Sequence, residues 1–151
     1  MGQRLLEWMY KDAIFLESDI DNNIGFVYII TNEVTGRKYI GKKLFWFAKT
    51  KQVNKKKKKF KVPSDWPDYY GSNEKLLEDV KELGKENFSR TILFLCKTKG
   101  ECSYLEAKEQ FNRNVIESDD YYNIWIMVRV RASHIKQLIE NTKNASDLQK
   151  D

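Results

Sequence analysis

Two tyrosines in strand-like segments are the first residues of this chain whose types and spacing could do chemistry. The triplet at 26–28 reads Phe-Val-Tyr and the triplet at 39–41 reads Tyr-Ile-Gly, with a turn between them. Tyrosines on paired strands can meet at one end of a hairpin, so Tyr28 and Tyr39 could face one substrate. A free tyrosine has a pKa of about 10, so either phenol needs a nearby cation or a metal-bound water to act as a base. The alternative is that both are ordinary packing residues of a strand.

The composition argues against several other kinds of chemistry. The chain has 151 residues, the length of one ordinary domain, and 41% of them are hydrophobic, enough to bury a core. A single histidine, His134, argues against Ser-His-Asp or Cys-His catalysis, and the two cysteines, Cys96 and Cys102, form no zinc-binding pattern. No stretch of about 18 apolar residues and no secretory signal is visible, so we expect no membrane span and a reducing compartment.

The positive charge is concentrated between Glu33 and Asp65, where there is no acidic residue. Like charges repel, so we expect residues 42–61 to form a mobile basic loop. This loop is either a solvated segment or import signal, or an arm whose cations bind phosphates and release counterions. Lysines would hold the DNA backbone without reading its sequence, because an ammonium group carries no fork geometry. The DNA-binding candidates are Lys42, Lys49, Lys55, Lys56, Lys57, Lys58 and Lys59.

Two further features near the basic segment have open alternatives. The aromatic residues at 45–47 either stack on bases or pack in a core. Arg90 begins an apolar run, so it either reaches a DNA phosphate or serves the structure. We include Arg90 among the DNA-binding candidates on the first of these interpretations.

Hydrophobic patterning predicts the elements that must position these residues. Four helices are expected at 3–17, 76–83, 101–116 and 132–142, the second of them ended by Gly84. Strands are expected at 26–31, 37–41, 88–96 and 121–130. This order predicts a single α/β (α+β) domain over residues 1–151, with a small, mainly antiparallel sheet flanked by helices.

With these elements in place, the two triplets resemble the paired GIY and YIG signatures of the GIY-YIG nuclease superfamily, to which homing endonucleases belong. Phe26 and Val27 stand where that family has Gly and Ile. The pairs Leu105-Glu106 and Tyr122-Asn123 follow in the family's order, so the resemblance covers roughly residues 25–124. The runs Tyr-Ile-Gly-Lys-Lys, Asp-Trp, Tyr-Gly-Ser and Tyr-Leu-Glu also resemble a sub-group common in bacteriophages. That likeness implies a phage-encoded protein acting in the cytoplasm of a bacterial host.

The resemblance implies an endonuclease that hydrolyses DNA phosphodiesters with one divalent metal, Mg²⁺ or Mn²⁺. Tyr28 would activate or position the attacking water, and Tyr39 would hydrogen-bond around the scissile phosphate. Glu106 would hold the metal, because one carboxylate completed by waters and substrate oxygens suits this hard ion. Glu109, one helical turn further on, is the competing ligand.

The remaining catalytic roles are also implied by the resemblance. The family's arginine after the second triplet falls at Lys49 here, and we take Lys43, nearer the end of the hairpin, as its substitute. A lysine supplies charge but no bidentate fork. Tyr70 or Ser72 would be a second general base, and Asn123 would brace the site by hydrogen bonds.

Two other classes of function remain as alternatives. The altered first triplet and the missing arginine motivate a non-catalytic nucleic-acid-binding protein on the same scaffold. A third reading is a protein that binds another protein through acidic and aromatic surfaces outside residues 34–64. The expected partner is double-stranded DNA, and self-association into a homodimer is one source from which specificity could come.

Overall fold

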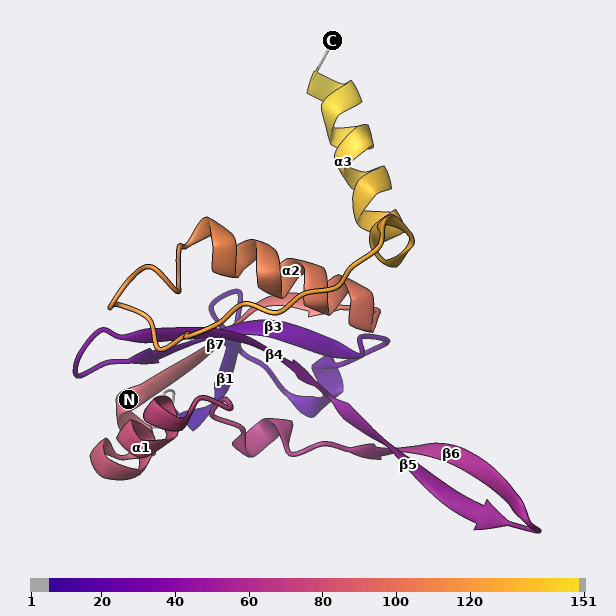
Figure 1. The fold of residues 1–151 in the computed structure, drawn as a ribbon, viewed down its shortest axis with the longest axis horizontal. Coiled ribbons are helices and arrows are strands. Elements are labelled where there is room, and N and C mark those ends of the chain that lie inside the picture. The colour runs from indigo at the N-terminus through magenta and orange to yellow at the C-terminus, as the bar shows by residue number, and fades with distance from the viewer. Residues whose placement is uncertain (1–5, 150–151) are drawn as a thin grey trace.

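The computed structural model describes residues 6–149 and arranges them around one mixed β-sheet (Figure 1). The sheet has five strands in the order β2-β1-β7-β3-β4. Its strands are β1 (Trp8–Tyr10), β2 (Ala13–Ile14), β3 (Gly25–Asn32), β4 (Lys38–Leu44) and β7 (Phe88–Cys96). In this sheet β1 runs parallel to β7, and the other strand pairs are antiparallel. The fold is α+β with a mainly antiparallel sheet, which confirms the predicted fold class.

Both faces of the sheet are covered, so each strand residue points into one of two cores. Side chains alternate along a strand, and Phe26, Tyr28 and Ile30 of β3 therefore enter one core while Val27 enters the other. Helix α1 (Glu74–Leu83) lies over the first core and helix α2 (Lys99–Asn112) over the second, on opposite sides of the sheet in Figure 1. This alternation places Tyr28 on the α1 side.

The two middle helices and the central strand β7 follow the prediction because their ends carry clear signals. The Asn73 side chain accepts a hydrogen bond from the first turn of α1, and Gly84 ends that helix with a φ of 93°. A capping box of Thr98 and Glu101 begins α2. Helix α2 ends at Asn112, earlier than predicted, and the chain then makes a turn.

The predicted N-terminal helix is wrong over the described part of its range, and residues 3–5 lie outside the described residues. The chain instead forms the β1–β2 hairpin, whose turn residues Lys11 and Asp12 have φ values of 49° and 66°. Trp8 is buried, and its indole N–H donates to the carbonyl of Trp66 at 2.7 Å. The apolar spacing of this segment reflects a strand that adds to the sheet beside β7. A 3-10 helix at Glu17–Asp19 follows.

The predicted basic loop is also wrong, because these residues form a second, two-stranded sheet. Strands β5 (Trp46–Val53) and β6 (Lys56–Pro63) pair antiparallel and leave the body of the protein as an arm (Figure 1). Asn54 and Lys55 make the turn with φ values of 50° and 63°. Of the neighbouring aromatics, Phe45 is buried in the core whereas Phe47 is exposed.

The last predicted strand does not form. Residues 121–130 run along the molecule mostly without pairing, and a single bridge joins Lys38 to Tyr121. A 3-10 helix (Ala132–Ile135) and helix α3 (Lys136–Gln149) then lead away from the body. Short 3-10 turns at Trp66–Asp68 and Lys85–Asn87 complete the described elements. Between residues 6 and 149, no helix combines the length and apolar character that crossing a membrane requires.

Candidate active site

The two tyrosines of the hairpin meet over a glycine. Tyr28 of β3 lies directly opposite Gly41 of β4, and β4 is the edge strand of the sheet. A Cβ on Gly41 would collide with the Tyr28 hydroxyl and crowd the ring of Tyr39. The two tyrosine rings lie 6.2 Å apart, centroid to centroid. A register shift in the β3–β7 ladder between Val27 and Tyr28 adds a local irregularity beside this residue. The predicted convergence of the tyrosines is therefore present in the fold.

A cavity of about 540 Å³ opens beside these residues at the edge of β4. Tyr39 and Lys42 of β4 form one wall, and Glu106 and Gln110 of α2 form another. The start of α1 and the extended segment 123–127 close the remaining sides. The lining residues are Tyr39, Lys42, Ser72, Asn73, Glu74, Glu106, Gln110, Asn123, Ile124, Trp125 and Met127.

Glu106 is the carboxylate that the fold brings to the tyrosines. Its burial raises the pKa of its carboxyl group to about 7, although the nearby charge and backbone of Lys42 act in the opposite direction. The negative charge of Glu106 in turn raises the pKa of both Tyr28 and Tyr39. These mutual effects place the carboxylate and both phenols in one electrostatic neighbourhood.

The competing glutamate lies elsewhere. The Glu109 carboxylate accepts a hydrogen bond from the Arg113 guanidinium at 2.8 Å, and Glu109 does not line the cavity. Of the two candidates, Glu106 is therefore the one that faces the tyrosines.

Both phenols are held in their neutral form. Burial is the largest cause that raises the pKa of Tyr28 well above its usual value, and a hydrogen bond with Tyr69 adds to it. Burial also raises the pKa of Tyr39, against which the Ser72 hydroxyl acts through a contact of 3.3 Å. A neutral phenol donates a hydrogen bond, so Tyr39, which lines the cavity, is suited to holding an oxygen of the substrate or of water, whereas Tyr28 is 1% exposed and does not line the cavity. Tyr69 was not among the residues predicted for the site.

Of the two candidates for a second base, Ser72 is the one beside the cavity. Gly71 between them has a φ of 90°, which turns the chain so that neighbouring side chains point apart. Tyr70 packs in the core with its ring over the Arg90 guanidinium, 4.2 Å away, and does not line the cavity. Ser72 lines the cavity and contacts Tyr39.

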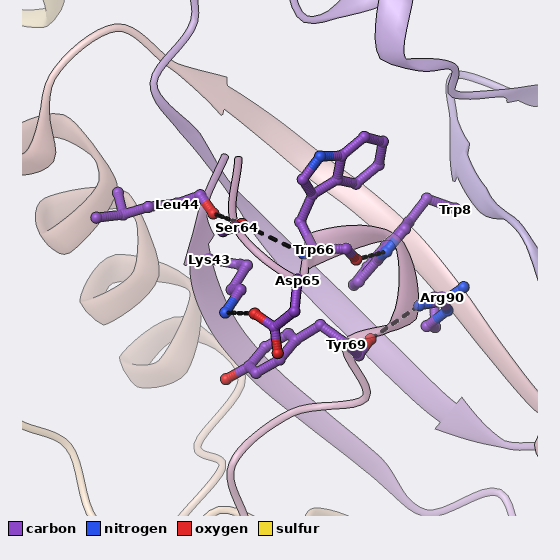
Figure 2. Close-up of polar contacts among 8 residues, drawn as sticks. All are labelled: Trp8, Lys43, Leu44, Ser64, Asp65, Trp66, Tyr69 and Arg90. Carbon is purple, nitrogen blue, oxygen red and sulfur yellow. Dashed lines mark hydrogen bonds and ion pairs between the residues drawn. The ribbon is translucent and has the colours of Figure 1, made fainter. Parts of the chain in front are cut away.

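The structure corrects the DNA-binding role of Arg90. Its side chain is 2% exposed and donates hydrogen bonds to the backbone carbonyls of Leu6, Pro67 and Tyr69. The guanidinium also lies 4.7 Å from the ring of Trp8. Arg90 thus ties the N-terminal strand to the loop before α1, and this burial keeps it from a DNA phosphate. Figure 2 shows its bond to Tyr69.

Lys43 is likewise engaged away from the cavity. Its ammonium group lies 2.6 Å from the carboxylate of Asp65 and 4.1 Å from the centre of the Tyr69 ring (Figure 2). The adjacent Lys42 is on the other side of the strand, lines the cavity and donates to the Ser103 hydroxyl at 2.6 Å. Lys42 is therefore the lysine of this pair that can reach a phosphate beside Glu106.

Asn123 holds the edge strand in place. Its side chain accepts from the backbone N–H of Ile40 at 3.0 Å and donates to the carbonyl of the same residue at 2.8 Å. Gln110 donates to that carbonyl as well, at 3.1 Å. These contacts agree with the bracing role expected of Asn123. The side-chain oxygen of Gln110 has no hydrogen-bond partner among the described residues, although it is buried.

Comparison with known proteins explains this arrangement. The family model described as "Putative endonuclease segE, GIY-YIG domain" matches residues 8–126. The chain belongs to the GIY-YIG family. It is also 35% identical over 99 residues to the protein "Putative endonuclease segE" of Enterobacteria phage T4. That alignment covers 66% of this chain and 40% of the phage protein, so the chain spans about two fifths of that relative's length. No solved structure matches.

The GIY-YIG match covers the parts of the fold that build the cavity. It begins at Trp8, the first residue of β1. It includes the β5–β6 arm and ends at residue 126, just beyond Asn123. Helix α3 lies outside the GIY-YIG match.

Proposed function

We propose that this GIY-YIG protein is a metal-dependent endonuclease that hydrolyses phosphodiester bonds in DNA. The observation that carries the proposal is the convergence of Tyr39 and Glu106 on one cavity, with Tyr28 and Lys42 beside them. This set provides hydrogen-bond donors, a carboxylate and a cation around one space, which are the groups that phosphodiester hydrolysis requires. The name of the phage relative, "Putative endonuclease segE", supports the same class of reaction.

The residues present fit a hard divalent cation. Glu106 supplies a carboxylate oxygen, and Gln110, which lines the same cavity one helical turn away, has a buried side-chain oxygen without a hydrogen-bond partner among the described residues. Within residues 6–149 no group of three His, Cys, Asp or Glu side chains is placed to hold a metal, so waters and DNA phosphate oxygens would complete the shell of Mg²⁺ or Mn²⁺. When bound, the metal would supply Lewis-acid activation of the phosphate and of water.

The protein's own residues then position the reacting groups. The neutral phenol of Tyr39 would donate a hydrogen bond to a phosphate oxygen, with the Ser72 hydroxyl fixing its direction. The Tyr28 hydroxyl, beside Tyr69, would orient the attacking water. Tyr28 could deprotonate that water only if a cation lowered the raised pKa of the Tyr28 phenol. Lys42 would neutralise charge that develops on the phosphate.

The altered first triplet does not weaken this assignment. Phe26 and Val27, which replace the Gly and Ile of the family signature, are both buried in the two cores and do not line the cavity. They change the packing behind the site rather than the groups that face a substrate. The non-catalytic alternative therefore rests on the absent arginine, a role for which Lys42 is placed.

The proposal is tested with supercoiled plasmid and Mg²⁺ or Mn²⁺. The parent chain is expected to nick or linearise the plasmid and to lose this activity in EDTA. Glu106→Gln should reduce cleavage by roughly 100-fold or more, as loss of a metal ligand does. Glu109→Gln is the matched control one turn away and should change it by less than about threefold. Undiminished cleavage by Glu106→Gln, or binding without cleavage by the parent under all metal conditions, would contradict the proposal.

A further inference from the structure

The β5–β6 arm presents an unusual surface. Every residue from 47 to 61 is exposed, so neither face of this two-stranded sheet is covered by the described part of the protein. Strands β5 and β6 and their turn contain no acidic residue. They contain eight lysines: Lys49, Lys51, Lys55, Lys56, Lys57, Lys58, Lys59 and Lys61. Isolated two-stranded sheets gain little stability alone, so an arm of this length and charge is suited to binding a polyanion.

The register divides the arm into two chemically different faces. Residues paired across an antiparallel ladder lie on the same face, and neighbours along a strand lie on opposite faces. One face, which we name the aromatic face, is formed by Phe47, Lys49, Lys51, Val53, Lys56, Lys58, Phe60 and Val62. The other, which we name the polar face, is formed by Ala48, Thr50, Gln52, Lys57, Lys59 and Lys61, with Trp46 and Pro63 paired at its base.

The polar face continues onto the side of the molecule that carries Glu106. At the base of the arm, Trp46, Ala48 and Lys61 of this face and Phe47 of the other line a cavity of about 340 Å³ together with Lys97 and Lys99 of the body. Lys99 is the first residue of α2, the helix on which Glu106 lies further along. Lys61 of the arm and Lys97 and Lys99 of the body therefore lie around one cavity at the base of the polar face.

The aromatic face is closed off at its base. The ammonium of Lys43 lies over the ring of Phe47, 4.9 Å from its centre, and is paired with the Asp65 carboxylate. This places a negative charge and a neutralised lysine where a DNA phosphate would approach. The two faces thus differ in the electrostatics of their base as well as in their side chains.

We propose that the β5–β6 arm lies in the major groove of duplex DNA with its polar face toward the base pairs, to one side of the cleaved bond. This inference rests on the proposed function, which supplies DNA as the substrate. The major groove admits a two-stranded β-ribbon, and the right-handed twist of such a ribbon follows the groove. Thr50 and Gln52 are able to hydrogen-bond base edges, and small Ala48 lets the ribbon approach closely. Lys57, Lys59 and Lys61 then contact phosphates and base acceptors along the groove.

The length of the arm sets how far from the cleaved bond its DNA contacts can lie. At a rise of roughly 3.4 Å per residue, the chain from Tyr39 to Val53 spans up to about 48 Å. One turn of DNA is roughly 34 Å, so contacts made by the arm extend up to about 1.4 turns from the cleaved bond. The arm leaves from one end of β4, so these contacts lie on one side.

The test compares two double variants that remove equal charge from interleaved positions. Lys57→Gln/Lys59→Gln changes the polar face, and Lys56→Gln/Lys58→Gln changes the aromatic face. Binding to a 40-base-pair duplex is measured in EDTA, with circular dichroism to confirm folding. The polar-face variant should bind roughly tenfold more weakly than the parent, and the aromatic-face variant within about threefold of it. Equal losses, or a larger loss from the aromatic-face variant, would overturn the inference.

A second readout identifies the groove. Methyl green, which occupies the major groove, should displace the parent chain, whereas netropsin, which occupies the minor groove, should leave the difference between the two variants unchanged. Loss of that difference with netropsin would overturn the assignment to the major groove. Because binding is measured without metal, plasmid cleavage by the parent tests the proposed function separately. Cleavage with equal binding by both variants refutes the inference alone, and unequal binding without cleavage refutes the nuclease alone.

Discussion

Gly41 lies directly opposite Tyr28 in the β3–β4 ladder, and the Tyr28 hydroxyl occupies the space that a Cβ on Gly41 would need. The same Cβ would come within 3.0 Å of the ring of Tyr39. This glycine therefore permits both phenols to converge at the free edge of the sheet. The glycine of the YIG triplet is thus required sterically, because Tyr28 occupies the space that a side chain at position 41 would need.

Gly41→Ala should consequently separate the two phenols. We expect cleavage per folded molecule to fall by roughly 100-fold and the free energy of unfolding to fall by about 1–3 kcal/mol, because the core is overpacked. Single-turnover cleavage and urea denaturation measure the two effects. Gly36→Ala is the control, since Gly36 has a φ of 81° and open space around it. That variant should lose stability through backbone strain while its folded fraction cleaves normally. Equal loss of activity in both variants would contradict this explanation.

The two adjacent lysines of β4 should behave differently. Lys42→Gln should lower kcat/KM by roughly 10- to 100-fold, because Lys42 lines the cavity and its charge favours the ionised form of Glu106. Lys43→Gln should leave kcat/KM within about threefold, because its ammonium is paired with Asp65 outside the cavity. Steady-state kinetics on a short labelled duplex distinguish the two. A larger loss from Lys43→Gln would restore the role that the sequence had suggested for it.

Metal binding should depend on pH through Glu106. Its pKa of about 7 means that the carboxyl group must lose a proton before it can hold a cation well. Mg²⁺ or Mn²⁺ should therefore bind roughly tenfold more weakly at pH 6 than at pH 8, with proton release on binding at pH 6. Isothermal titration calorimetry in two buffers of different ionisation enthalpy measures both. Binding that is independent of pH in this range would show that Glu106 is not the ligand.

The raised pKa of Glu106 also determines whether the free energy of unfolding of the metal-free protein rises or falls with pH. Between the ordinary glutamate pKa and about 7, the folded state retains a proton that the unfolded state has lost. The free energy of unfolding should thus fall as the pH rises through this window, and level off above it. Urea denaturation from pH 4.5 to pH 8 should show this component in the parent and not in Glu106→Gln. If the difference in free energy of unfolding between the parent and Glu106→Gln rose with pH in this window, it would contradict the raised pKa.

Arg90 should be important for stability rather than for DNA binding. Arg90→Leu should lower the free energy of unfolding by about 3 kcal/mol or more, because it leaves three backbone carbonyls without their donor. The salt dependence of DNA binding by the folded variant should be unchanged, because the residue is buried. Urea denaturation and binding at several salt concentrations provide the two measurements. A stable variant with a flatter salt slope would contradict the structural role.

The sequence predicted the β3–β4 hairpin and missed the β5–β6 arm for related physical reasons. Strand β3 and its partner β4 were predictable because they contain β-branched and aromatic residues that bury one or both faces. The β5–β6 arm buries neither face, and the repulsion expected between its lysines led to the prediction of a loop. The local signal for a hairpin was the turn at Asn54. The N-terminal strand β1 was mistaken for a helix because its three residues are too short to display a period of two.

The candidate site divides in the same way. Tyr28, Tyr39, Glu106 and Asn123 were predicted from the resemblance to the GIY-YIG motifs, and the fold places Tyr39, Glu106 and Asn123 around one cavity with Tyr28 beside Tyr39. The choice of Lys42 over Lys43, and of Ser72 over Tyr70, depends on which side of a strand or turn each residue occupies. Lys42 and Lys43 are adjacent and therefore lie on opposite sides of β4, and Tyr70 and Ser72 are separated by the turn at Gly71, so the structure was needed to choose within each pair.

The most direct measurement of the account is the position of a Mn²⁺ ion, located by its anomalous scattering in crystals of the chain with an uncleaved duplex. The ion should be bonded to the carboxylate of Glu106 and to a DNA phosphate oxygen, with the Tyr39 hydroxyl in contact with the same phosphate. An ion bound at Glu109 or Asp65, or a duplex whose phosphates lie away from the cavity at the edge of β4, would contradict the account.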